Sequence, residues 1–220
     1  MTAIVVPALA LMQALFAAAP AGAQEPAVHA VMADHAAEAC APGPQRTTPA
    51  GERQCDAGGN LAGIAGVAGG MQRVEVLVRW VDLVAEPCLF PSPPSASSAR
   101  RAGAAPALTT PPPPPPTPET AIAACDGALG WLARFEVALT DDRNRADVAP
   151  ELFLTLGQAH RNRGEALTAA DGGPSARACA AFAAGREAVG RIDMSSWYVR
   201  SRSGFPLIIA EVEAAGAACP

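Results

Sequence analysis

The stretch TPETAIAACDGALGWLARFEVALTDDRNRADVAPELFLTLGQAHRNR, residues 117–163, decides the fold class. Its start is typical of a helix, because Thr117 can cap the first turn, Pro118 fits that turn and Glu119 lies near the positive end of the helix dipole. Apolar side chains then recur at helical spacing, at Ile122, Cys125, Leu129, Leu132 and Leu139. A second apolar stripe follows the polar turn 141–145, so the stretch predicts two helices joined as a hairpin.

The second helix of this hairpin is expected to begin at Asp147, which can cap it, and to run to about Arg163. The helix is expected to stop at Gly164 or slightly later, because glycine commonly follows the last turn of a helix. The inward-facing side chains are predicted to be Leu152, Phe153, Leu156 and Ala159.

Helical patterns continue on both sides of the hairpin. Downstream, Gly172-Gly173-Pro174 breaks the chain before a third helix that ends near Gly190, and a last helix is expected over 206–217. Upstream, residues 26–39 predict a short amphipathic helix and 59–70 a glycine-rich loop. Residues 71–86 predict a longer helix, although their valines would also suit a strand. The chain is therefore predicted to be all-α, built of helical hairpins.

Two segments are expected to lie outside the folded part. Residues 1–23 are typical of a signal peptide, since an apolar run ends in small residues before Gln24; the alternative is an uncleaved anchor. Residues 91–118 are rich in proline and predict a disordered, semi-rigid linker. The expected organisation is thus a signal peptide (1–23), an N-terminal helical segment (24–90), the linker (91–118) and a helical-hairpin domain (119–220).

All six cysteines follow the expected cleavage site, at Cys40, Cys55, Cys88, Cys125, Cys179 and Cys219. An even number of cysteines in an exported chain, with no C-x-x-C pair, favours disulfides over a zinc site. Six cysteines allow 15 connectivities. The most local candidate is Cys40 with Cys55.

Composition excludes several classes of function. The formal net charge is −5 and the pI about 5.2, so the field of the chain repels nucleic acid. All 16 basic residues are arginine, which excludes P-loop lysines, Schiff-base lysines and Ser-Lys dyads. Together with the abundant Ala, Gly and Pro, this usage is typical of a GC-rich bacterial genome.

Residues 147–190 resemble a single degenerate tetratricopeptide repeat. The similarity rests on Leu156-Gly157, His160, Gly164 and then Ala178 with Phe182. It departs from the family pattern because His160 stands where an aromatic side chain is usual and because the stretch 165–177 is long for the turn. The resemblance implies a protein-binding helical hairpin, although no second copy of the repeat is present.

The motifs that could carry chemistry are weak. His29, Met32 and His35 have helical spacing and could hold a soft metal, but ordinary surface histidines are the favoured interpretation. The run 142–147 begins like a calcium loop and lacks its later ligands, which favours an inter-helix turn. Aromatic and arginine residues gather over 197–205, where core packing is favoured over a binding hot spot. We expect no catalytic residues, no metal and no cofactor.

The sequence thus favours an exported, non-catalytic interaction module of the bacterial envelope, periplasmic or secreted, with a protein or peptide partner. The alternatives are a hydrolase or metal-dependent enzyme with an unrecognised site and a periplasmic metal-handling protein. The resemblance implies that the face of 147–163 opposite its packing stripe is free to bind the partner. That face carries Glu151, Leu154, Gln158, Arg161 and Asn162.

Export generates the first testable prediction. Intact-mass measurement of the protein recovered from the periplasm or the medium should give a mature chain that begins at Gln24. Recovery of the full-length chain from the membrane fraction would show instead that the apolar segment is kept as an anchor.

Overall fold

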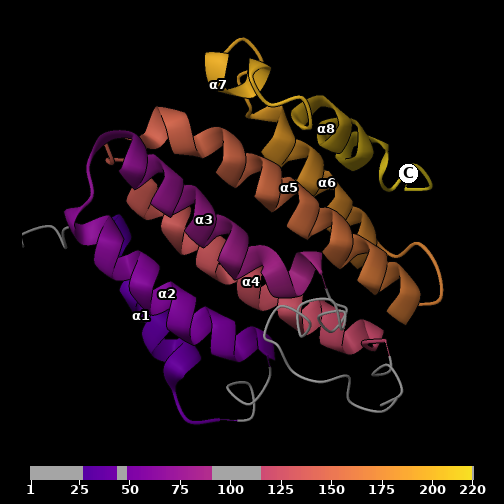
Figure 1. Ribbon diagram of the computed structural model, residues 1–220. Coiled ribbons are helices and arrows are strands. Elements are labelled where there is room, and N and C mark those ends of the chain that lie inside the picture. The colour runs from indigo at the N-terminus through magenta and orange to yellow at the C-terminus, as the bar shows by residue number, and fades with distance from the viewer. Residues whose placement is uncertain (1–26, 44–48, 91–114, 220) are drawn as a thin grey trace, which may run out of the picture.

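The computed structural model describes residues 27–43, 49–90 and 115–219, and within these ranges the chain forms helices and turns without any strand (Figure 1). The helices are α1 (Val28–Cys40), α2 (Pro49–Val67), α3 (Gly70–Leu89), α4 (Pro118–Leu139), α5 (Arg145–Ala170), α6 (Ala176–Gly190), α7 (Trp197–Arg200) and α8 (Phe205–Ala214). The all-α prediction is confirmed. The expected signal peptide and most of the expected linker lie outside the described residues.

Consecutive helices from α1 to α6 pack against one another as antiparallel hairpins (Figure 1). The first helix also contacts α4, α3 contacts α5, and α8 lies across α5 and α6. A single main core receives buried side chains from all eight of these helices or their flanking turns. The parts of the chain before and after the expected linker therefore share that core.

The centre of the core lies between α3 and α4. Trp80 and Phe135 are fully buried there, and their rings stack with centroids 4.8 Å apart. The helix predicted over 71–86 is confirmed as α3, and burial of Val74, Leu77, Val81 and Val84 on its apolar stripe explains why its valines form a helix.

The expectation of a glycine-rich loop over 59–70 is wrong for most of its length, because α2 runs through it to Val67. Glycine disfavours helices by about 1 kcal/mol per residue, but packing can override that preference. Here Cys55, Ala62 and Ala65 are buried, and Gly58 lies against α1, where an added Cβ would be 3.6 Å from that of Ala36. The small residues allow α2 to approach α1 closely.

The predicted bounds of α5 also require correction. The helix begins at Arg145, and Asn144 occupies the N-cap position without a capping hydrogen bond from its side chain, so Asp147 is not the cap. At its other end the helix continues beyond Gly164 to Ala170. Gly164 is a point of close approach: a Cβ there would lie 2.7–2.9 Å from ring atoms of Phe182 on α6. The glycine is required by packing between the two helices and does not end α5.

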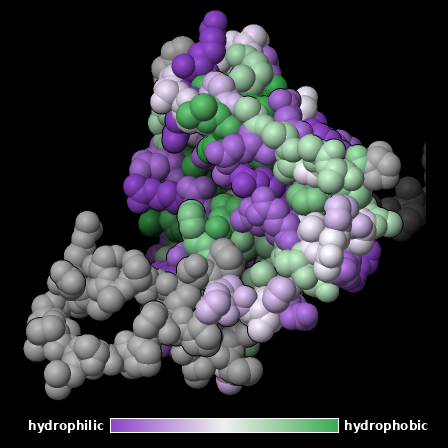
Figure 2. Space-filling view, turned by 90° about the vertical axis from the view of Figure 1, so that its right-hand side faces the viewer, coloured by the Kyte–Doolittle hydropathy of each residue, from purple (hydrophilic) through white to green (hydrophobic). Residues whose placement is uncertain are grey.

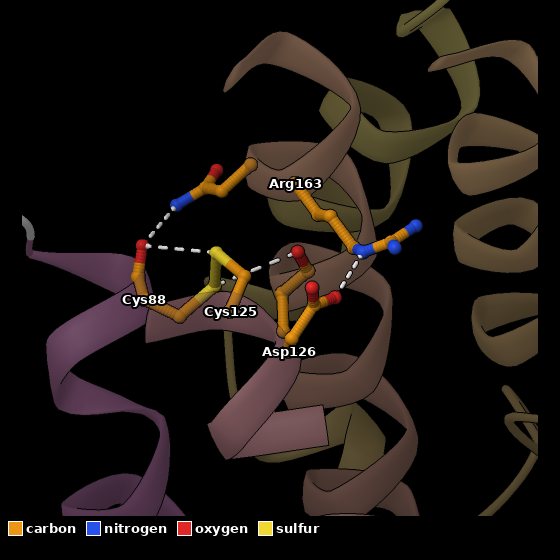
Figure 3. The surroundings of a disulfide bond; sticks show 6 residues. Cys88, Cys125, Asp126 and Arg163 are labelled. Atoms are coloured by element: carbon orange, nitrogen blue, oxygen red, sulfur yellow. Dashed lines mark hydrogen bonds and ion pairs between the residues drawn. A yellow bond between two sulfur atoms is a disulfide. The ribbon is translucent and has the colours of Figure 1, made fainter. Parts of the chain in front are cut away.

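Three disulfides connect the helices, and the expected Cys40–Cys55 pair is confirmed. It joins α1 to α2, Cys88–Cys125 joins α3 to α4, and Cys179–Cys219 joins α6 to the turn after α8. Around Cys88–Cys125, Arg163 of α5 also pairs with Asp126 of α4 at 2.5 Å (Figure 3). Three disulfides are typical of a protein of an oxidising, extracytoplasmic compartment.

At the opposite ends of the first four helices the connections are non-covalent. Arg73 at the start of α3 pairs with Asp142 in the turn between α4 and α5 at 2.7 Å and donates a hydrogen bond to the carbonyl of Ala65 on α2. Asp142 also accepts a hydrogen bond from the backbone N–H of Asn144 at 2.8 Å, which confirms the turn predicted there. Among the described helices, none is both long enough and apolar enough to cross a bilayer.

The contact between Gly164 and Phe182 can be tested with a matched pair of substitutions. Gly164→Ala should lower the free energy of unfolding by about 1–3 kcal/mol, because the added methyl group collides with the Phe182 ring. Gly130→Ala on α4 is the control, since no atom lies within 4 Å of its added Cβ, and it should raise stability by up to about 1 kcal/mol. Denaturant titration of the oxidised proteins measures both, and equal stability of the two variants would contradict the proposed close approach.

Candidate functional site

A cavity of about 410 Å³ lies between α1, α2, α3 and α4. Most of the side chains that line it are small. Helix α4 contributes one continuous face, made of Thr120, Ala123, Ala124, Gly127, Ala128 and Trp131. These positions follow the i, i+3, i+4, i+7 spacing of a helix face, and their small side chains leave the space that bulkier residues would fill. The volume is in the range of small-molecule sites.

The covalent framework of the bundle surrounds this cavity. Its lining residues come from the C-terminal ends of α1 and α3 and the N-terminal ends of α2 and α4. The Cys40–Cys55 and Cys88–Cys125 disulfides lie at these same ends, with Cα–Cα distances of 4.7 and 4.4 Å. Each disulfide fixes one hairpin, so the cavity is formed by the fold and does not depend on a bound ligand.

His35 is the most unusual residue of the cavity lining. Its side chain is 4% exposed and packs edge-to-face against Trp80 and Trp131, with ring centroids 5.4 and 5.2 Å away. Within the described part of the chain, its Nδ1 atom has no hydrogen-bonding partner. Burial lowers the pKa of His35 to about 4, so the ring is neutral at pH 7. The nitrogen lies against α2, where an added Cβ on Gly58 would be 3.7 Å from it.

The charged groups near the cavity are already engaged elsewhere, with one exception. Arg134 stacks over the ring of Trp131 at 4.1 Å and pairs with Asp34 at 3.0 Å. Arg53, next to the lining residue Gln54, is paired with Glu86 at 2.6 Å. Glu38 is the exception, because among the described residues of the lining it alone is charged, and its side chain is exposed to solvent.

A second polar cluster lies where α7 meets α5. The Tyr198 hydroxyl donates to Glu151 at 3.2 Å and accepts a hydrogen bond from Arg202 at 3.0 Å. Burial raises the pKa of Glu151, and it raises that of Tyr198 to about 12. The three side chains satisfy one another, so the cluster fastens the 197–205 segment to the bundle. In that segment Phe205 is buried in the core, which confirms core packing for that residue.

The face of α5 that was expected to bind a partner is not free. Leu154 is 4% exposed and belongs to the main core, and six consecutive residues, 152–157, are buried. Arg161 pairs with Glu165 and with Glu211 of α8, and Asn162 donates to the carbonyl of Cys88 on α3. Glu151 binds Tyr198, and Gln158 is half-buried. The expectation of an open row is therefore wrong, because α3 and α8 cover a helix that was expected to pack on one side only.

The surface on the side of the molecule shown in Figure 2 does not carry a single large hydrophobic patch. Figure 2 views the side of the molecule that lies at the right of Figure 1, and hydrophobic patches there are interrupted by hydrophilic residues. Leu207 on α8 is one of the exposed apolar side chains. Scattered residues of this kind are ordinary on a protein surface.

The structure does not bring together His29, Met32 and His35, which were weighed as metal ligands. Met32 and His35 are buried, whereas His29 is exposed, so the two histidines do not share a surface. The described ranges also contain no group of three or more His, Cys, Asp or Glu residues placed to hold a metal ion.

Comparison with known proteins gives no relative: no family model, curated protein or solved structure matches the chain. The resemblance of residues 147–190 to a tetratricopeptide repeat therefore rests on sequence alone. The cavity was not predicted, although two signals were present. These are the run of small residues along one face of 120–128 and a histidine on the apolar face of 26–39.

Burial of His35 predicts a specific dependence of stability on pH. The pKa is lower in the folded chain, about 4, than the ordinary value of 6.5, so the unfolded chain binds the proton first. The part of the free energy of unfolding that depends on a neutral His35 is fully present above pH 6.5. It is lost as the pH falls to about 4, which lowers the free energy of unfolding by about 3 kcal/mol. Denaturant titrations between pH 4 and 7 should show this loss in the wild type and a smaller one in His35→Gln. Parallel curves for the two proteins would refute the assignment.

Proposed function

We propose that the chain is an exported, non-catalytic binding protein and that the cavity between α1 and α4 is its ligand site. The observation that carries the proposal is a preformed cavity of about 410 Å³ that two disulfides frame and whose lining includes buried His35 and Trp131. An apolar cavity with a few polar groups is the usual form of a small-molecule site.

Export to the periplasm or the medium of a bacterium agrees with the sequence pattern of residues 1–23 and with the three disulfides. A binding role is favoured over catalysis by the surroundings of His35. Its ring contacts two tryptophans, and among the described residues no carboxylate, hydroxyl or thiol is hydrogen-bonded to it. A histidine with a pKa of about 4 is also a weak base at neutral pH.

The ligand is proposed to be a small molecule, which refines the expected interaction module. The cavity is far too small for a helix, and the α5 face that was expected to bind a polypeptide is covered by α3 and α8. Trp131 lines the cavity and Trp80 contacts His35 from the core side. Both indoles are therefore placed to report on binding through their fluorescence.

Two glycines on α4 provide a matched test of the proposed site. Gly127 lines the cavity and Gly130 does not, and neither would place a Cβ within 4 Å of another group. Both substitutions, Gly127→Leu and Gly130→Leu, should fold and should gain similar helix stability. The probe 2-phenylethanol should bind the wild type and Gly130→Leu alike and bind Gly127→Leu at least about tenfold more weakly, as measured by calorimetry and tryptophan fluorescence. Absence of binding to the wild type, or equal binding to the two variants, would exclude the cavity as the site.

A further inference from the structure

The Cys179–Cys219 disulfide differs from the other two in its exposure to solvent. Both of its cysteines are half-buried and keep part of their surface in contact with solvent. Each of the other bridges contains a buried cysteine, since Cys88 and Cys125 are each 1% exposed and Cys55 is 7% exposed. Thiol–disulfide exchange begins when a thiolate reaches one sulfur atom, so access favours Cys179–Cys219.

A pocket of about 300 Å³ lies beside this bridge and is open to solvent. Cys219 is one of the residues that line it, together with Phe182 of α6 and the neighbouring end of α5. Among its described lining residues only Glu165 is charged, and that carboxylate is paired with Arg161 at 2.9 Å. A small anionic reagent can therefore approach Cys219 without meeting an unpaired carboxylate of the lining.

The turn that carries Cys219 is also held by non-covalent contacts. Arg186 on α6 donates a hydrogen bond to the carbonyl of Ala215 at 2.9 Å, and the N–H of Cys219 donates to the carbonyl of Gly216 at 2.8 Å. Gly216 has a φ of 71° and lies against Phe182, where an added Cβ would be 2.6–2.8 Å from atoms of that side chain. These contacts hold the turn against α6 after reduction, so the bridge can form again.

The cysteines also differ in how readily they leave as thiolates. Cys179 is the fourth residue of α6, after the N-cap Ser175, and the positive end of a helix dipole stabilises an anion in the first turn. Cys219 lies outside the helices. In the Cys40–Cys55 bridge, Cys40 is the last residue of α1, at the negative end of the dipole, and burial of Cys55 disfavours a thiolate. Attack on Cys219 with departure of Cys179 is therefore the favoured route.

We propose that Cys179–Cys219 is a site of reversible thiol–disulfide exchange with an external dithiol. A thiolate of the dithiol attacks the sulfur of Cys219 and forms a mixed disulfide, while the original S–S bond breaks and Cys179 leaves with the electron pair. The second thiolate of the dithiol then displaces Cys219. The dithiol is oxidised to a disulfide, and the two cysteine thiolates take up the two protons that its thiols released.

This exchange site is separate from the cavity between α1 and α4. None of the six cysteines, all of which the structure describes, is among the lining residues that it gives for that cavity. The two disulfides that frame the cavity stay closed while Cys179–Cys219 reacts. The inference therefore goes beyond the proposed function and does not depend on it.

The order of reduction tests the site. The oxidised protein is treated with limiting dithiothreitol, quenched with acid at intervals and alkylated, and its disulfides are mapped by mass spectrometry. Cys179–Cys219 should be reduced at least about tenfold faster than either of the other two bridges. Reduction of another bridge at an equal or higher rate would overturn the proposal.

A monothiol identifies the sulfur atom that is attacked. 2-Mercaptoethanol has no second thiol to displace Cys219, so an early acid quench followed by alkylation should trap the mixed disulfide. The adduct is expected on Cys219 and the alkyl label on Cys179. The reverse pattern would overturn the assignment of Cys179 as the leaving group.

Two alanines provide matched variants for the approach through the pocket. Both Ala218 and Ala214 are exposed, but only Ala218 is among the described lining residues. Ala218→Glu should slow the reduction of Cys179–Cys219 by dithiothreitol at least about threefold, because a carboxylate there repels the incoming thiolate. Ala214→Glu changes the net charge equally and should leave the rate nearly unchanged. Equal rates in the two variants would overturn the pocket as the route of attack.

Discussion

The stack of Trp80 on Phe135 is the contact on which the arrangement of the bundle depends. The rings lie 4.8 Å apart between α3 and α4, and both side chains are fully buried. Toward the C-terminal half of α4 the inward residues remain large, with Leu132, Phe135 and Leu139, and the neighbouring helices pack closely against them. In its N-terminal half the buried residues are the smaller Cys125 and Ala128. The gradient in side-chain size along one helix thus gives a dense core at one end and a cavity at the other.

Sequence patterns predicted the features that arise within one segment. The apolar spacing of 122–139 and the Thr117 cap gave α4 correctly, and Thr117 does accept a hydrogen bond from the N–H of Thr120. The valine-rich segment 71–86 was also assigned correctly, because charges at helical spacing distinguish it from a strand. Local disulfide closure likewise identified Cys40–Cys55.

Features that depend on contact between segments were missed. Gly164 of α5 was interpreted by its intrinsic preference, yet it permits the close approach of Phe182 on α6, and Gly58 of α2 lies against α1. Leu154 was placed on an open face because the sequence does not show that α3 and α8 cover α5. The cavity was missed for the same reason, since it exists only where four helices meet. His35 also depends on contact between segments, because its burial and its contacts with Trp80 and Trp131 arise only where α1, α3 and α4 meet.

The two ends of the first four helices are held together by different kinds of bond. Disulfides hold the end that contains the cavity, while the opposite end relies on Arg73, its ion pair with Asp142 and its hydrogen bond to α2. Salt screens ionic contacts and leaves disulfides intact. Partial unfolding would therefore begin at the ionic end, where the helices would separate while the disulfides keep their other ends together. Such opening keeps the end that contains the cavity assembled, so the helices can separate at one end and close again without losing their register at the other.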